Sequence, residues 1–193
     1  MKMISRKIGT KLEQLNNNIQ SCQKCELCKL EFNIKDVSQG FGKLYGWKGG
    51  TNKCRFLFIG MNPSHNRFQN LEFAFGGRDE NQGPGKAFVN TLKESGIINE
   101  IYVTNLIKCS SSSNTINETW INCCILHLLN EIEILRPTKI ITMGSQVYDF
   151  LSVYFTNNNI QIKIQNIWHP SYVFSYRRVS KEQYIKKIKK AAS

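Results

Sequence analysis

The sequence contains no long hydrophobic segment. None of its apolar runs approaches the roughly 20 residues that a helix needs to cross a bilayer, which excludes a transmembrane helix. The N-terminal stretch, residues 1–14, is basic but has no apolar core, so it does not fit a secretory signal peptide. With 193 residues and a hydrophobic content of 41%, we expect one cytoplasmic domain spanning 1–193.

Acidic residues are scarce. The chain has 14 Asp and Glu against 26 Lys and Arg, which gives a formal net charge of +12. Such a balance suits a polyanionic partner, because each phosphate that is neutralised releases condensed counterions. The same excess also fits a simple role in solubility, so charge alone gives nucleic acid only even odds.

The seven cysteines are an odd number. Because no secretory signal precedes them, disulfides are not expected in a reducing compartment. Clustered thiols in such a chain point to a metal, a metal cluster or catalysis.

Hydrophobic periodicity predicts strands that alternate with helices. Short apolar runs predict strands at 55–59, 101–104, 139–143 and 160–168. Amphipathic stretches predict helices at 6–20, 87–94, 115–135, 144–154 and 181–190. The alternation predicts an α/β fold, a three-layer α/β/α sandwich with a central four-stranded parallel sheet.

Polar groups follow three of these strands directly. Gly60, Met61 and Asn62 come after the first strand, Asn105 after the second and His169 after the fourth. Because ligands of parallel sheets sit at the carboxyl ends of the strands, these groups are expected to converge on one edge. The Gly- and Asn-rich residues 64–86 are expected to form a long functional loop beside it.

Four segments together resemble the uracil-DNA glycosylase superfamily, most closely its family 4 enzymes, which carry an iron–sulfur cluster. The first is a Cys-x-x-Cys pair, the second reads Gly-Met-Asn-Pro-Ser, the third ends in Ile-Lys-Cys and the fourth reads His-Pro-Ser-Tyr. In chain order they occupy 22–27, 58–64, 101–109 and 169–172. The resemblance covers about residues 20–175 and implies the α/β fold predicted above.

The resemblance implies a [4Fe–4S] cluster as cofactor. Its expected ligands are Cys22, Cys25, Cys109 and Cys124. Cys28 and Cys123 are neighbours that could replace one of them, and thiolate sulfur also suits zinc. Cys54, just before a strand, is expected to be a plain core residue.

The resemblance also implies which residues act on the base. Family 4 enzymes usually have glutamate in the motif where this chain has Met61, and Asn62 looks like the asparagine that orients water in the mismatch-specific and single-strand-selective branches. His169 is expected to stabilise the departing base, and both residues are the expected catalytic groups. From the residues alone, a simple turn formed by Asn62 and its proline is the favoured interpretation.

Base recognition is expected from further residues of the same segments. Asn105 offers a donor and an acceptor to the edge of a flipped base. Phe75, with Phe73 as the alternative, would stack on it, although both could also be core residues. Ser64 stands where uracil-specific enzymes place tyrosine, so the pocket is expected to admit a 5-substituted pyrimidine. The full expected base-binding set is Gly60, Met61, Ser64, Phe75 and Asn105.

Contacts with DNA are expected mainly after the fourth strand. An apolar side chain, Val173 or Phe174, would enter the minor groove, and Ser171 would contact a phosphate. The full expected set is Lys86, Ser171, Tyr172, Val173, Phe174, Arg177 and Arg178.

These observations lead to one functional hypothesis and its alternatives. The chain is expected to be a monomeric, monofunctional DNA glycosylase that hydrolyses the N-glycosidic bond of a flipped uracil or modified pyrimidine and leaves an abasic site. Alternatives are an enzyme for thymine mismatches or for 5-substituted pyrimidines used in defence, and a catalytically silent DNA-binding protein. A redox or zinc protein would explain the Cys-x-x-Cys pair but not the other three segments. No obligate protein partner and no membrane partner are expected.

Overall fold

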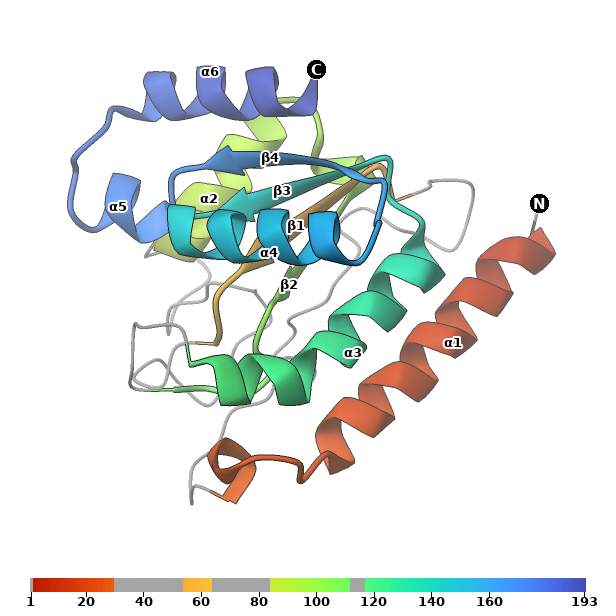
Figure 1. The fold of residues 1–193 in the computed structure, drawn as a ribbon. Coiled ribbons are helices and arrows are strands. Elements are labelled where there is room, and N and C mark those ends of the chain that lie inside the picture. The colour runs from red at the N-terminus through yellow and green to blue at the C-terminus, as the bar shows by residue number, and fades with distance from the viewer. Residues whose placement is uncertain (1, 30–53, 64–83, 112–116) are drawn as a thin grey trace.

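A central parallel sheet organises the chain (Figure 1). The computed structural model describes residues 2–29, 54–63, 84–111 and 117–193, without the side chains of 2–9, 84 and 86. Its sheet has four strands in the order β2-β1-β3-β4. The strands are β1 (Phe56–Gly60), β2 (Ile101–Asn105), β3 (Lys139–Met143) and β4 (Lys163–Ile167).

Helices cover both faces of the sheet (Figure 1). Helices α2 (Pro84–Glu94) and α6 (Lys181–Ala192) lie on one face. Helices α3 (Glu118–Leu135) and α4 (Ser145–Asn157) lie on the other, and α1 (Lys2–Ser21) packs outside α3. The predicted three-layer α/β/α sandwich with a four-stranded parallel sheet is therefore confirmed.

The strand positions follow from the apolar runs. Every residue of β1, β2 and β3 is buried, as expected for strands covered on both faces. Strand β4 lies at an edge of the sheet, and only its last residue is fully buried. In the register of β1 and β2, Gly60 pairs with Asn105, so the carboxyl ends of these strands lie level.

Local signals set where the helices begin and end. Helix α2 starts at Pro84, earlier than predicted, because proline fits the first position of a helix. Asn117 caps α3 by accepting from the amide of Trp120, so this helix starts later than predicted. Gly96 has a φ of +77° and donates to the carbonyl of Lys93, the left-handed glycine that commonly ends a helix, here α2.

Two short helical turns complete the described parts. A 3₁₀ helix, Glu26–Lys29, follows the first cysteine pair. The five-residue helix α5, Pro170–Phe174, follows β4, where the sequence analysis predicted no helix. Within the described ranges, no helix is both long and apolar enough to cross a membrane.

Candidate active site

The segments after β1 and β2 are bonded to each other beyond the ends of the strands. The amide of Leu106 donates to the carbonyl of Gly60 at 2.9 Å, and the amide of Ile107 donates to that of Met61 at 2.8 Å. These bonds continue the parallel pairing past the sheet and hold the two segments side by side. The predicted neighbours Met61 and Asn105 are thus brought to one edge.

The side chain of Asn105 leaves no room for a side chain at position 60. A Cβ atom added at Gly60 would lie 2.5 Å from Oδ1 of Asn105 and 3.5 Å from Cε of Met143. Real Cβ atoms do not approach an oxygen that closely, so only glycine fits while Asn105 keeps this orientation. The glycine of the second motif therefore serves the placement of the Asn105 amide.

Replacing Gly60 with alanine is expected to displace the Asn105 amide. We expect a stability loss of about 1–3 kcal/mol from overpacking and a loss of activity of about 10-fold to 100-fold from misplacement. Thermal unfolding and single-turnover assays would measure the two effects. In an Asn105→Ala background the clash has no partner, so Gly60→Ala should then be tolerated. A stability loss of equal size in both backgrounds would contradict this explanation.

Asn62 follows β1 and is half-buried. Its amide nitrogen Nδ2 donates to the carbonyl of Pro63 at 2.9 Å and points to that of Ser111 at 3.4 Å. Since the nitrogen faces two carbonyl groups, the oxygen Oδ1 is the end of the amide that can accept from a water molecule. This orientation is compatible with the role predicted for Asn62, which stays a prediction.

His169 is held as a neutral imidazole. Its Nδ1 accepts a hydrogen bond from the amide of Ser171 at 3.2 Å, which caps helix α5. Burial lowers the pKa of His169 to about 4. With Nδ1 accepting, the proton of the neutral ring lies on Nε2, which makes this nitrogen a hydrogen-bond donor.

The end of β3 lies beside His169. Gly144, which follows β3 with a φ of +105°, donates to the carbonyl of Ile167, and its Cβ position is 3.9 Å from Cβ of His169. His169 thus stands at the same edge of the sheet as Gly60 and Asn105. Ser64 and Phe75 lie outside the described residues, as does the side chain of Lys86.

The segment after His169 buries Val173, leaves Phe174 partly exposed and exposes two tyrosines. Val173 is 3% exposed and belongs to the core, and the Phe174 ring packs edge-on against Tyr184 at 5.7 Å. Tyr172 and Tyr176 are 44% and 69% exposed. The burial of Val173 argues against it as the side chain that enters the minor groove, while Phe174, Tyr172 and Tyr176 keep exposed surface.

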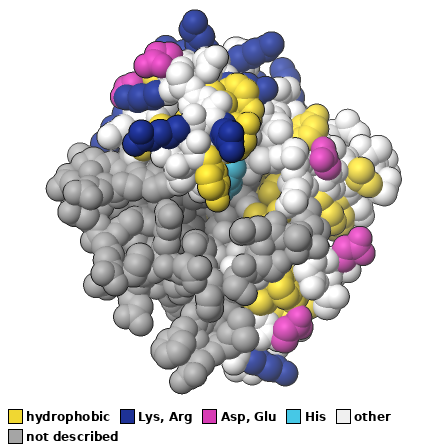
Figure 2. All heavy atoms as spheres, turned by 90° about the vertical axis from the view of Figure 1, so that its left-hand side faces the viewer, with side chains coloured by type: hydrophobic (Ala, Val, Ile, Leu, Met, Phe, Trp, Pro, Cys, Tyr) yellow, Lys and Arg dark blue, Asp and Glu magenta, His cyan; other side chains and the backbone are white. Residues whose placement is uncertain are grey.

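Basic side chains accompany these tyrosines. Arg177 and Arg178 are exposed, and Arg177 has a φ of +51°, which a non-glycine residue rarely adopts. An open hollow of the surface is lined by both arginines, Phe174 and Lys181. Figure 2 views this side of the molecule and shows Lys and Arg side chains next to hydrophobic ones on its upper part.

The cysteine pair of the N-terminal segment lies against α3. The carboxylate of Glu26 accepts from the indole Nε1 of Trp120, and Cys123 Sγ points to the carbonyl of Lys24 at 3.5 Å. One hydrophobic core contains the buried thiols of Cys25, Cys54, Cys109 and Cys124. Three of the four predicted ligands thus share one region of the fold.

The remaining predicted ligand, Cys22, is close enough to affect the pKa of Cys124. The pKa of the Cys124 thiol is raised to about 11, mainly by burial and to a smaller extent by the Cys25 and Cys22 thiols. Lys108 opposes this, because its amide donates to Cys124 Sγ at 3.4 Å. Within the described ranges, no three His, Cys, Asp or Glu side chains are arranged around a single metal ion. Three of the predicted ligands are buried and Cys22 is half-buried, and thiol sulfur with a backbone amide donating to one of the sulfurs is the donor chemistry that an iron–sulfur cluster uses. The cluster itself stays a prediction.

Cys54 occupies the position that the sequence predicted. It is 5% exposed, and its thiol points to the carbonyl of Phe56 at 3.6 Å. Burial raises its pKa to about 12, which is the behaviour of an inert core cysteine.

The sequence interpretation did not include a buried ion pair behind Asn105. Nζ of Lys108 lies 2.7 Å from Oε2 of Glu131, and both side chains are 2% exposed. Burial raises the pKa of Glu131, and Lys108 opposes this rise. The sequence did contain a sign of this ion pair. Glu131 interrupts the apolar face that α3 turns toward the sheet, and a buried carboxylate needs a partner.

Known proteins resemble this chain over most of its length. The family model described as the uracil DNA glycosylase superfamily matches residues 48–192. The type-4 uracil-DNA glycosylase of Saccharolobus solfataricus is 28% identical over 151 residues, which cover 72% of this chain and 58% of that protein. That of Archaeoglobus fulgidus is 25% identical over 200 residues, which cover 93% of this chain and 90% of that protein.

A solved structure supports the fold. A mutant of the UNG protein from Nitratifractor salsuginis superimposes with a TM-score of 0.52 at 12% identity, over 95% of this chain and 97% of that one. The sheet order, the segments at its carboxyl edge and the family match over residues 48–192 agree with one another. The chain belongs to the uracil-DNA glycosylase superfamily.

Proposed function

We propose that this protein is a monofunctional DNA glycosylase that removes uracil or a related pyrimidine and leaves an abasic site. The observation that carries this proposal is the set of polar groups at the carboxyl edge of the sheet. Asn62 presents an acceptor, and His169 presents a donor in its neutral form. These are the groups that hydrolysis of an N-glycosidic bond requires.

The two residues have complementary roles in the proposed reaction. Oδ1 of Asn62 orients a water molecule toward the sugar carbon C1′. The C1′–N1 bond breaks, and its electron pair leaves with the base, whose charge spreads onto O2. Nε2–H of His169 donates a hydrogen bond to that oxygen and stabilises the anion. The water oxygen then bonds to C1′ and loses a proton to solvent.

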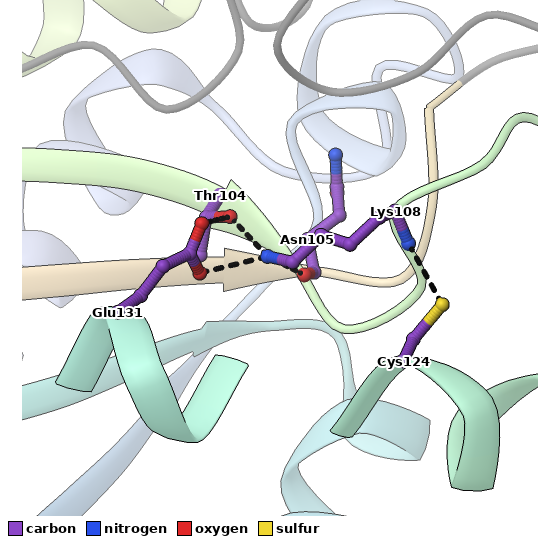
Figure 3. A network of polar contacts seen from close by, with 5 residues as sticks. All are labelled: Thr104, Asn105, Lys108, Cys124 and Glu131. Atoms are coloured by element: carbon purple, nitrogen blue, oxygen red, sulfur yellow. Dashed lines mark hydrogen bonds and ion pairs between the residues drawn. The ribbon is translucent and has the colours of Figure 1, made fainter. Parts of the chain in front are cut away.

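Asn105 is the proposed reader of the base. In Figure 3 its side chain points away from the Lys108–Glu131 ion pair, and its backbone carbonyl faces the ammonium of Lys108. An amide offers both a donor and an acceptor, which match the O4 and N3–H groups of uracil. The short distance from Oδ1 to the Cβ position of Gly60 supports a fixed orientation for this amide.

The choice of base is open between uracil and 5-substituted pyrimidines, including thymine in mismatches. Ser64 in place of tyrosine favours a pocket that admits a substituent at C5. The test is a panel of DNA strands that carry uracil, mismatched thymine or 5-substituted pyrimidines, followed by alkali to cut abasic sites. Cleavage of a 5-substituted base supports the open pocket, whereas strict preference for uracil contradicts it.

The exposed tyrosines and arginines form the proposed DNA contact. Tyr176 is the side chain that we expect to fill the gap left by the flipped nucleotide, because it is the more exposed tyrosine, Val173 is buried and the Phe174 ring packs on Tyr184. Arg177 and Arg178 would meet phosphates of the same strand.

Removing one of these arginines is expected to weaken DNA binding most at low salt. Arg178→Ala should reduce the slope of log affinity against log salt by about one unit, because one fewer counterion is released. Lys163→Ala is the matched control, since it removes one exposed charge at the amino end of β4. Equal changes in slope for both variants would contradict a DNA contact at Arg178.

The proposed cofactor is a [4Fe–4S] cluster that ties the N-terminal segment to the core. Its proposed ligands are Cys22, Cys25, Cys109 and Cys124. The cluster would supply a structural link between α1, α3 and the segment after β2, with no role in bond cleavage. Analysis of iron and acid-labile sulfide in the purified protein tests it, and stoichiometric zinc without iron would contradict it.

A further inference from the structure

The ammonium of Lys108 is surrounded by three acceptors. Its Nζ donates to Oγ1 of Thr104 at 2.6 Å, to the carbonyl of Asn105 at 2.7 Å and to Oε2 of Glu131 at 2.7 Å. Oγ1 of Thr104 in turn donates to Oε1 of Glu131 at 3.0 Å. All three donors of the ammonium are used, so the network is complete (Figure 3).

Such a network is an inefficient way to stabilise a fold. Lys108 and Glu131 are each 2% exposed, and removing two charges from water opposes most of the energy gained by pairing them. Apolar residues of the same size often stabilise a core as well or better. A function in fixing local geometry therefore explains the buried Lys108–Glu131 pair better than a function in stability.

The geometry that the network fixes is that of Asn105. Lys108 binds the backbone carbonyl of Asn105 from one side, while the amide of Leu106 is bonded to Gly60 on the other. The backbone amide of Lys108 also donates to Sγ of Cys124, which anchors the lysine to α3. The turn that carries the Asn105 side chain is thereby held at both ends.

We propose that Lys108 is a positioning residue, which uses its ion pair with Glu131 to fix Asn105 for base recognition. This inference rests on the proposed glycosylase function. Lys108 does not contact the base in this proposal, so Lys108 affects the reaction only through Asn105. A lysine that acted only on overall stability would affect the reaction whether or not Asn105 were present.

A double-mutant cycle separates these two roles. The test variant replaces the network with apolar residues of similar size, Thr104→Val, Lys108→Met and Glu131→Met together, so that no buried charge is left unpaired. Alone, it should slow single-turnover base release by about 10-fold to 100-fold, because the reading amide is misplaced. Combined with Asn105→Ala, it should add less than about 3-fold to the loss from Asn105→Ala alone.

Folding and DNA binding serve as controls. The triple variant should unfold at a temperature near that of the wild type and bind DNA as tightly, with the loss confined to the single-turnover rate of base release. Equal losses with and without Asn105, or no loss at all, would overturn the proposal for Lys108 and leave the glycosylase function standing. A wild-type protein that releases no base would instead overturn the proposed function and this inference with it.

Discussion

Replacing His169 with alanine is expected to slow base release by about 100-fold to 1,000-fold, the usual effect of removing one donor to a developing anion. The donor is Nε2–H of a neutral ring, because Nδ1 accepts from Ser171 and burial holds the pKa at about 4. Single-turnover release of the base would measure the loss. DNA binding should change little, since the hydrogen bond strengthens only as charge reaches the base.

Alanine at His169 also removes the cap of helix α5, so a matched variant is needed. His169→Asn keeps a side-chain acceptor for the amide of Ser171 and is a favourable capping residue. Its shorter amide does not reproduce the imidazole donor. We therefore expect His169→Asn to fold like the wild type and to remain slow. Recovery of the wild-type rate by asparagine would show that capping, and not donation to the base, is the role of His169.

The low pKa of His169 makes the stability of the fold depend on pH but leaves the rate of base release constant near neutral pH. Because His169 stays neutral until the pH approaches 4, its titration should leave the rate unchanged between about pH 5 and 8. The unfolded chain protonates this side chain below its usual pKa of 6.5, whereas the folded protein does not. Stability from this group is therefore complete above pH 6.5 and is lost as pH falls toward 4, by up to about 3 kcal/mol. His169→Asn should remove that part of the pH dependence.

Replacing Asn62 with alanine is expected to slow base release by about 100-fold through loss of the oriented water. The affinity for DNA should be kept, because the proposed contact of Asn62 is with water alone. Parallel cleavage and binding assays measure both quantities. If Asn62→Ala matches the wild type in every cleavage assay, the role of Asn62 is wrong.

An aspartate at the same position provides a chemical control. The amide nitrogen of Asn62 faces the carbonyl groups of Pro63 and Ser111, and a carboxylate oxygen there would meet both with like partial charge. Aspartate should therefore turn away from the water position despite being the stronger base. We expect Asn62→Asp to be slower than the wild type at neutral pH, and a faster variant would contradict the orientation of this amide.

Much of the fold followed from short apolar runs in the sequence. The runs that form β1, β2 and β3 are buried on both faces, so their composition alone marks them as parallel strands. Once the strands are parallel, their carboxyl ends share one edge, which is why Asn105 and His169 could be placed there in advance.

Other features depend on contacts between distant residues. Lys108 and Glu131 are separated along the chain, and each alone resembles an ordinary charged residue until α3 packs on the sheet. Helix α5 has five residues, too few to show helical periodicity, although Pro170 after His169 was a signal for a helix start. The burial of Val173 follows from that helix and could not be predicted without it.

The most direct test of the account is the product balance of the wild-type protein on DNA that carries a single pyrimidine lesion. Uracil and 5-substituted pyrimidines are each placed in single- and double-stranded DNA, and the free base and the abasic sites are measured together. The account predicts one free base for each abasic site, with strand cleavage only after alkali. Tight DNA binding without release of any base would contradict it and identify the protein as a catalytically silent member of its superfamily.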